Sequence, residues 1–211
     1  SGFATDQKMY DSSFGWRFVN PEMEKTYGVE AMGKTAENLA EMYKILREEQ
    51  DEFALNSQMK ATKAQESGRL AEEISDIQIP QRTGDSILVN RDEFIKPNSS
   101  LEILGKLKPA FVKENGTVTA GNASGLNDGA AAMIIASGDA VKNYGLKPLA
   151  KIVCSAVVGV EPRIMGIGPV DATKLALKRA GLTLDQIDII ELNEAFAAQS
   201  IACLKELGIA N

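Results

Sequence analysis

The residues best suited to chemistry lie where an apolar strand is expected to end and a helix to begin. The largely apolar residues 187–192 lead directly into Asn193 and Glu194, and small helix-forming residues follow. Open α/β sheets hold ligands at the carboxyl ends of their strands, which is where this polar pair is expected. An amide there can hydrogen-bond a carbonyl oxygen or a water molecule at an oxyanion site. Capping of the helix by Asn193 is the simpler alternative, and spacing by itself favours it.

The chain contains no histidine among its 211 residues. A reaction that needs imidazole must therefore be completed by residues outside these 211, or does not take place here. The two cysteines, Cys154 and Cys203, are far apart and lie in apolar stretches without an adjacent basic residue. Such cysteines usually behave as small buried hydrophobic residues, so we expect neither a nucleophile nor a disulfide nor a metal site. Together these features indicate part of an enzyme rather than a complete one.

Composition places the chain among ordinary globular proteins. Hydrophobic residues make up 44% of it and charged residues 25%, which excludes overall disorder. The net charge is -6 and basic residues are interspersed with acidic ones, so a nucleic-acid partner is not expected. The apolar runs are short and interrupted, which excludes a membrane-spanning helix, and residues 1–6 do not resemble a secretion signal. We therefore expect a cytoplasmic protein without a membrane partner.

Sequence periodicity predicts the secondary structure. Helices are expected where apolar residues recur with a helical period, several of them ending at a glycine. They cover residues 36–43 (with Thr35 as N-cap), 47–65, 101–107, 139–144, 171–180 and 194–207. Strands are expected where residues alternate or form β-branched apolar runs. They cover residues 73–80, 116–120, 130–136, 150–160 and 187–192.

Small residues fill the expected loop at residues 121–129. Small side chains allow a ligand to lie against the backbone, whose N–H groups can meet polar ligand atoms. The loop lacks the glycine spacing of a dinucleotide fingerprint. A tight turn packed by its own side chains is the alternative, and spacing alone favours it. Residues 166–169 are expected to form a structural turn, because Asp171 would repel an anion at the following helix.

Four segments resemble the signatures of the thiolase family. Residues 116–131 resemble one signature and residues 193–197 a second. Residues 32–38 resemble part of the loop domain that covers coenzyme A in this family, and residues 165–169 also match. The segments occur in the family's order and extend over nearly the whole chain. The resemblance implies the thiolase α/β fold, layered α/β/α halves with a helical loop domain, present here in part.

The resemblance also implies a division of the chain into three parts. Residues 1–100 correspond to the loop domain, residues 101–146 to the end of the N-terminal half, and residues 147–211 to the start of the C-terminal half. In the family, the nucleophilic cysteine precedes these positions, and a histidine and a second cysteine follow them. We therefore expect a central segment that is inactive by itself.

A closer resemblance is to the 3-oxoadipyl-CoA thiolases of aromatic degradation. It rests on residues 15–21 and 27–32, where Ala31 stands at a position that is histidine in many other thiolases. This subgroup cleaves 3-oxoadipyl-CoA with coenzyme A to succinyl-CoA and acetyl-CoA. The alternatives are a fatty-acid or acetoacetyl-CoA thiolase, or a non-catalytic thiolase-like module that binds acyl-CoA.

Individual residues receive roles from the same resemblance. Asn193 would hold the water molecule of an oxyanion hole, and Ser124 would hydrogen-bond the pantetheine arm of coenzyme A. The small residues forming the bed of that arm would be Ala120, Ala123, Gly125 and Leu126; those lining its tunnel would be Met32, Ala195 and Phe196. Lys96 would meet the nucleotide phosphates, where several thiolases have Arg. Coenzyme A is implied as a substrate, with no tightly bound cofactor, and a homo-oligomer (dimer or tetramer) is implied as the assembly.

Overall fold

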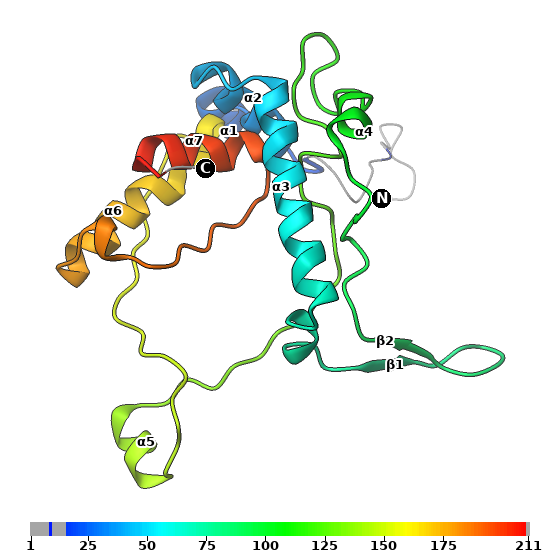
Figure 1. Ribbon diagram of the computed structural model, residues 1–211. Coiled ribbons are helices and arrows are strands. Elements are labelled where there is room, and N and C mark those ends of the chain that lie inside the picture. Colours follow the sequence, from blue (N-terminus) through cyan, green and yellow to red (C-terminus); the bar gives the residue numbers. More distant parts are fainter. Residues whose placement is uncertain (1–8, 10–15, 210–211) are drawn as a thin grey trace, which may run out of the picture.

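Four helices form the packed body of the molecule. The computed structural model describes residue 9 and residues 16–209. In the body, α7 (Ala197–Leu207) lies against α2 (Met32–Met42), α3 (Arg47–Glu66) and α6 (Gly168–Ala180) (Figure 1). The buried side chains of this core are Leu39, Ile45, Phe53, Ala197, Ile201 and Ala202. Burial of the larger ones, worth about 1.5–3 kcal/mol each, holds together helices from both ends of the chain.

The ends of the long helices follow from their sequences. At the start of α3 the Glu49 carboxylate accepts a hydrogen bond of 2.7 Å from the Leu46 N–H, one of the donors that a helix start leaves unpaired. At the other end of their helices, Gly181 closes α6 and Gly208 closes α7, both in the left-handed conformation that glycine adopts without strain. The predicted helices over residues 47–65 and 171–180 are confirmed, although α6 begins three residues earlier.

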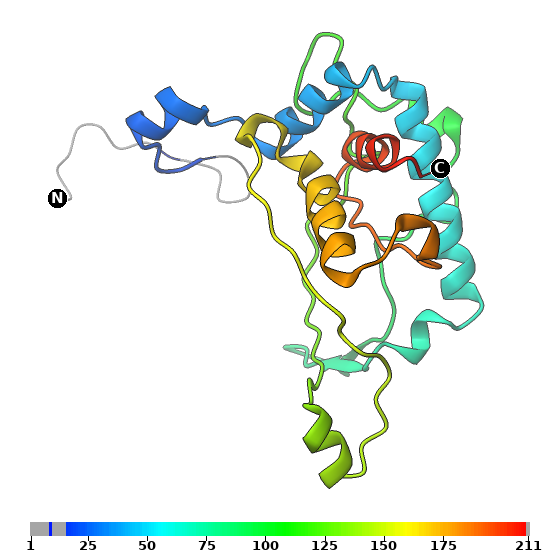
Figure 2. The ribbon, with the colours of Figure 1, turned by 90° about the vertical axis from the view of Figure 1, so that its left-hand side faces the viewer.

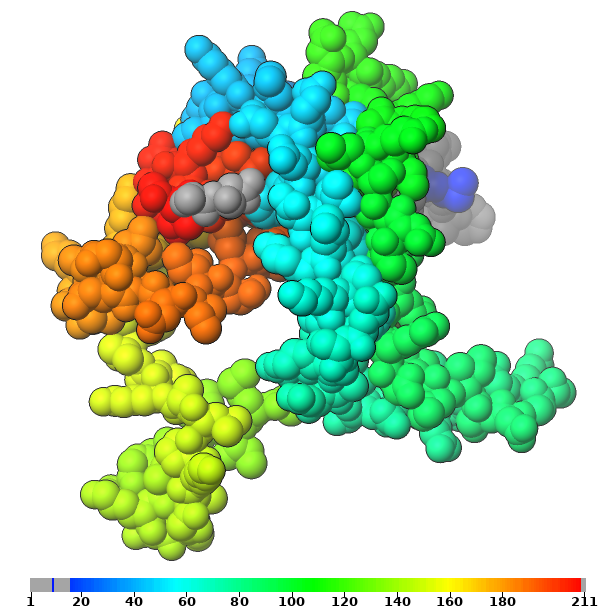
Figure 3. All heavy atoms as spheres, viewed as in Figure 1, coloured from blue at the N-terminus to red at the C-terminus, as the bar shows by residue number. Residues whose placement is uncertain are grey.

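Several elements lie outside the body. An antiparallel hairpin of β1 (Ile77–Ile79) and β2 (Ile87–Val89), with Ile77 opposite Val89, and the short helix α5 (Gly138–Asn143) project from it (Figures 1 and 3). Figure 2 shows α1 (Pro21–Tyr27) extending away from the other helices. The remaining elements are α4 (Leu101–Gly105), which packs on α3, and the 3-10 helices Leu70–Glu72, Pro162–Ile167 and Leu184–Gln186. No helix in the described part of the chain combines the length and the apolar character needed to cross a bilayer.

The expected strands at residues 116–120, 130–136, 150–160 and 187–192 are not strands in this structure. Those predictions were wrong because a strand exists through its hydrogen bonds to a neighbour, and the described residues bring no partner strand beside these segments. Many of their apolar side chains are exposed to solvent; Ile134, for example, is 92% exposed. An apolar groove of about 420 Å³, formed with α6 and α7, includes Ile189 and Ile190. The expected edge strand at residues 73–80 is present only as β1.

Two expected helix starts also differ from the structure. Thr35 was predicted as an N-cap, but it lies inside α2 and its hydroxyl donates to the Met32 carbonyl at 2.7 Å. The helix expected from residue 194 begins at Ala197, with Phe196 as its N-cap. Residues 195–197 are engaged in backbone hydrogen bonds with residues 122–124 instead. That pairing requires extended backbone and delays the start of the helix.

Candidate functional site

The loop around Ser124 and the segment before α7 lie side by side. Ala123 and Phe196 form an isolated antiparallel bridge. The Ser124 N–H donates to the Ala195 carbonyl at 3.0 Å, and the Ala197 N–H donates to the Asn122 carbonyl at 2.9 Å. The structure therefore brings together two segments that are far apart in sequence and that both carry predicted site residues.

A pair of aromatic rings links α2 to the junction, the place where residues 122–124 pair with residues 195–197. The rings of Phe111 and Phe196 meet edge to face, with centroids 6.1 Å apart and an interplanar angle of 81°. The Phe111 ring also lies so close to Gly33 that a Cβ there would be 2.3 Å from three ring carbons. Only glycine admits this approach. Gly33 directly follows Met32 in α2, so Phe111 links the start of the helix that carries the predicted tunnel residue Met32 to the predicted tunnel residue Phe196.

A second ring, Phe94, links the loop to Lys96. A Cβ at Gly125 would be 2.5 Å from the Phe94 ring. The Lys96 ammonium lies 5.7 Å from the centroid of the same ring, within the range of a cation–π interaction. The Lys96 N–H also donates to the Gln58 side chain on α3 at 2.8 Å. The structure thus places Lys96 at one end of a continuous set of contacts that includes Gly125.

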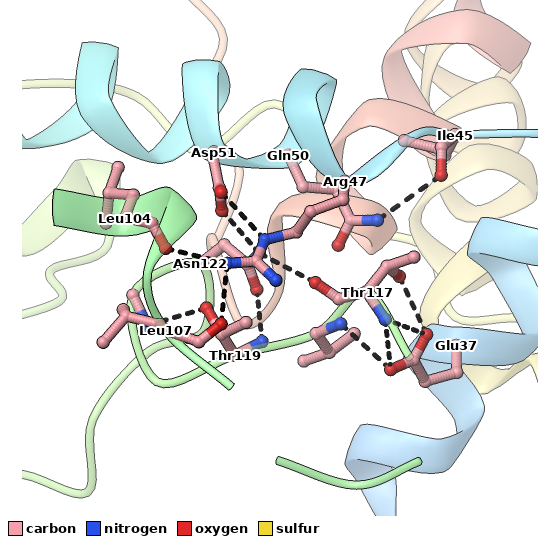
Figure 4. A network of polar contacts seen from close by, with 12 residues as sticks. Glu37, Ile45, Arg47, Gln50, Asp51, Leu104, Leu107, Thr117, Thr119 and Asn122 are labelled. Carbon is pink, nitrogen blue, oxygen red and sulfur yellow. Dashed lines mark hydrogen bonds and ion pairs between the residues drawn. The ribbon is translucent and has the colours of Figure 1, made fainter. Parts of the chain in front are cut away.

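Neither Phe94 nor Phe111 was predicted as a site residue from the sequence. Each is the single aromatic residue of a connecting stretch rich in charged residues and proline, and that isolation was the available signal. The buried polar residues that hold the loop, which Figure 4 shows together, were not predicted either. The Glu37 carboxylate on α2 accepts hydrogen bonds from the Thr117 N–H at 2.9 and 3.0 Å, from the Thr117 hydroxyl at 2.8 Å and from the Val118 N–H at 2.9 Å.

Several predicted ligand-binding groups face solvent. Asn193, Ser124 and Ala120 are exposed, and Leu126 is 73% exposed. Since α7 is capped by Phe196, the interpretation of Asn193 as the cap of that helix is wrong. The neighbouring Glu194 carboxylate accepts a hydrogen bond of 2.5 Å from the Ser57 hydroxyl of α3, which fixes the segment that carries Asn193.

The two cysteines are engaged in packing and hydrogen bonding. Cys203 is fully buried in α7, and this burial raises the pKa of its thiol above the ordinary value. Its Sγ–H donates to the Gly166 carbonyl at 3.3 Å. The Cys154 Sγ–H donates to the Ala176 carbonyl of α6 at 3.2 Å. A reactive cysteine needs an accessible thiolate, which the surroundings of Cys203 disfavour.

Two family models match the chain along nearly its whole length. The model described as "Thiolase, N-terminal domain" matches residues 6–139, and the model described as "Thiolase, C-terminal domain" matches residues 146–211. The chain belongs to the thiolase family. The family resemblance seen in the sequence motifs is thereby confirmed.

Curated thiolases of three bacteria are similar over the whole chain. A beta-ketoadipyl-CoA thiolase of Acinetobacter baylyi is 54% identical over 209 residues, which are 99% of this chain and 52% of that protein. The beta-ketoadipyl-CoA thiolase of Pseudomonas aeruginosa is 53% identical over 211 residues, 100% of this chain and 52% of that protein. The 3-oxoadipyl-CoA/3-oxo-5,6-dehydrosuberyl-CoA thiolase of Escherichia coli is 52% identical over 209 residues, 99% and 52% respectively. The chain spans about half the length of these curated relatives.

Solved structures agree with this family. The crystal structure of the Bacillus anthracis acetyl-CoA acetyltransferase has a TM-score of 0.85 at 43% identity, over 98% of this chain and 53% of that chain. The crystal structure of human mitochondrial 3-ketoacyl-CoA thiolase has a TM-score of 0.81 at 49% identity, over 85% and 45% respectively. The fold is therefore a partial thiolase α/β fold, as the sequence predicted.

Proposed function

We propose that the whole protein containing this chain is a thiolase that cleaves 3-oxoadipyl-CoA with coenzyme A to succinyl-CoA and acetyl-CoA. The observation that carries this proposal is the 52–54% identity to relatives whose names specify beta-ketoadipyl-CoA or 3-oxoadipyl-CoA. The name of the Escherichia coli relative adds 3-oxo-5,6-dehydrosuberyl-CoA as a second candidate substrate. Family resemblance also supports a cytoplasmic homo-oligomer that uses coenzyme A as a substrate rather than as a tightly bound cofactor.

The proposed reaction exchanges one carbon–carbon bond for a thioester. A cysteine thiolate attacks the 3-oxo carbon, the bond between C2 and C3 breaks, and the released acetyl-CoA carbanion takes a proton. The succinyl group stays on the cysteine sulfur until the coenzyme A thiolate attacks it and restores the enzyme thiolate. This chain has no histidine, Cys203 is buried, and the Cys154 Sγ–H is engaged with the Ala176 carbonyl. The catalytic imidazole and thiolate would therefore come from outside the 211 residues.

This chain would supply the binding surface and one oxyanion group. Asn193 would hold a water molecule at the oxyanion that forms when the carbonyl is attacked, where preorganised donors have their largest effect. Ser124 would hydrogen-bond the pantetheine arm above the small residues of its loop. The solvent-facing positions of Asn193 and Ser124, and the backbone pairing between their segments, support these roles.

Turnover of competing substrates tests the proposed function. The whole open reading frame should be expressed, and its product should be assayed with coenzyme A and either 3-oxoadipyl-CoA or acetoacetyl-CoA. We expect succinyl-CoA and acetyl-CoA from the first substrate, at a higher kcat/KM than for the second. A preference for acetoacetyl-CoA would indicate a general thiolase. Binding of coenzyme A without turnover of either substrate would indicate a non-catalytic module.

A methyl group at Gly125 is expected to weaken the use of coenzyme A. In Gly125→Ala the new Cβ would be 2.5 Å from the Phe94 ring, so the ring, and with it the Lys96 contact, must move. We expect the KM for coenzyme A to rise about five- to tenfold, the equivalent of roughly 1 kcal/mol for an overpacked contact.

Gly138→Ala is the matched control for this variant. Gly138 lies at the start of the projecting helix α5, and a Cβ there would have no neighbour within 4 Å. Its KM for coenzyme A should equal that of the unchanged protein. Equal KM values for Gly125→Ala and Gly138→Ala would indicate that the loop at residues 121–129 is only a structural turn and does not bind coenzyme A.

A further inference from the structure

Both the oxygen and the nitrogen of the Asn122 side-chain amide form hydrogen bonds. It is only 3% exposed, and its Oδ1 accepts a hydrogen bond of 2.8 Å from the Thr119 N–H. Its Nδ2 donates to the Thr117 carbonyl at 3.0 Å and to the Asp51 carboxylate at 2.9 Å. Its backbone carbonyl accepts from the Ala197 N–H at 2.9 Å. One side chain therefore shapes the loop, joins it to α3, and lies next to the backbone contact with α7.

Asp51 connects this loop to α3 and, through Arg47, to α4. Its side chain is buried, and the carboxylate oxygen that Asn122 does not use accepts a hydrogen bond of 2.8 Å from Arg47 Nε. Arg47 Nη2 in turn donates to the carbonyls of Leu104 at 2.7 Å and Leu107 at 3.1 Å (Figure 4). A buried carboxylate is costly unless it is paired and hydrogen-bonded, and this one is both. These hydrogen bonds thus connect Asn122 to both α3 and α4.

The residues on both sides of the junction are the ones expected to meet substrate. Directly after Asn122, the chain makes the bridge between Ala123 and Phe196 and the hydrogen bond from Ser124 to Ala195. A displacement of Asn122 would therefore move the Ser124 hydroxyl. It would also move the segment that carries Asn193, because the two segments are joined by backbone hydrogen bonds.

We propose that Asp51 and Asn122 are positioning residues for the coenzyme A bed and, through the backbone pairing, for Asn193. Neither acts on the substrate itself. The complementary pair formed by the Asp51 carboxylate and the Asn122 amide holds the loop at the distance from α7 at which Ser124 and Asn193 can act on one ligand. This inference rests on the proposed function for its consequences in catalysis, but its structural part does not depend on it.

Exchange of the two side chains tests the pair. In Asn122→Asp, two carboxylate oxygens would face each other where an N–H now donates, and in Asp51→Asn one amide N–H would face another donor. The double variant Asp51→Asn/Asn122→Asp restores one donor–acceptor pair, with the Asn amide oxygen still free to accept from Arg47. In the whole protein we expect each single variant to raise the KM for coenzyme A about tenfold or more. The double variant should have a lower KM than Asn122→Asp but should not return to the KM of the unchanged protein, because a carboxylate at position 122 cannot donate to the Thr117 carbonyl as the Asn122 amide does at 3.0 Å.

The split between KM and kcat separates positioning from a merely structural role. A residue that only stabilises the fold would reduce the amount of active enzyme, which lowers the apparent kcat and leaves KM unchanged. Glu102→Gln is the matched control: Glu102 also lies four residues from its basic partner on a helix, at 2.6 Å from Lys106, but their side chains are 80% and 71% exposed. An unchanged KM in both single variants, or a double variant no better than Asn122→Asp, would overturn the proposal.

Hydrogen–deuterium exchange provides a readout that does not require turnover. We expect faster amide exchange over residues 117–124 and 195–197 in both single variants, and slower exchange in the double variant than in Asn122→Asp. If the unchanged protein neither binds coenzyme A nor cleaves a 3-oxoacyl-CoA, the proposed function fails while this exchange pattern still decides the inference. Unaltered exchange in the single variants would overturn it.

Discussion

Replacement of Asn193 by Asp in the whole protein is expected to lower kcat by roughly 10²–10³-fold, the usual cost of losing one oxyanion donor. The substitution keeps the volume of the side chain but replaces a donor amide with a carboxylate directed at developing negative charge. Stability should change by less than about 0.5 kcal/mol, as for most exposed positions. Asn193 is exposed, and it lies ahead of α7 without capping it. Turnover and thermal unfolding should be measured on the same preparation.

A matched substitution elsewhere makes this result specific. Asn143→Asp introduces the same chemical change at the exposed end of α5, which projects away from the body. It should leave kcat unchanged. Full activity of Asn193→Asp would contradict a role of Asn193 in the mechanism. A loss of activity could not be attributed to a lost helix cap, because the structure already excludes that role.

Helices were predictable here because their hydrogen bonds are local. The period of apolar residues located α3 within one residue, and Gly181 and Gly208 marked the ends of α6 and α7 where the sequence placed them. Strands were not predictable, because each needs hydrogen bonds to a neighbouring strand, which the sequence of the segment does not specify. Residues 130–136 form a small, apolar run and residues 150–160 a β-branched one, as expected of buried strands, yet neither segment pairs with another strand in the described part of the chain.

The site was predictable only through its motifs. Resemblance of residues 116–131 and 193–197 to family signatures identified the two segments that the structure pairs at Ala123 and Phe196. Spacing alone gave no sign that they meet. The groups that hold them were missed because their partners are distant in sequence: Glu37 and Thr117 are 80 residues apart. Nothing local distinguishes Glu37 from Glu41 on the same helix, although one is buried and the other exposed.

Glu37→Ala is expected to lower the free energy of unfolding by about 3–5 kcal/mol, a large share of the stability of an ordinary domain. The Glu37 carboxylate receives three donors, the N–H and hydroxyl of Thr117 and the N–H of Val118. Hydrogen bonds to a charged group are worth about 1.5–3 kcal/mol each, and removal of their acceptor leaves the fully buried Val118 N–H without a partner. The half-buried Thr117 groups can recover part of the loss by bonding to water, which keeps the total below the simple sum.

Urea unfolding of the whole protein measures this loss as a fall in the midpoint at constant slope. Glu41→Ala is the matched control, because it removes the same side chain one turn further along α2 from an exposed position, and it should cost less than about 0.5 kcal/mol. Glu37→Gln should fall between the two, since its amide oxygen still accepts a bond from one or two of the donors while its N–H₂ cannot. Equal midpoints for Glu37→Ala and Glu41→Ala would show that the loop at residues 117–122 is held without the carboxylate. The hydrogen bonds from Thr117 and Val118 to Glu37 would then contribute no measurable stability.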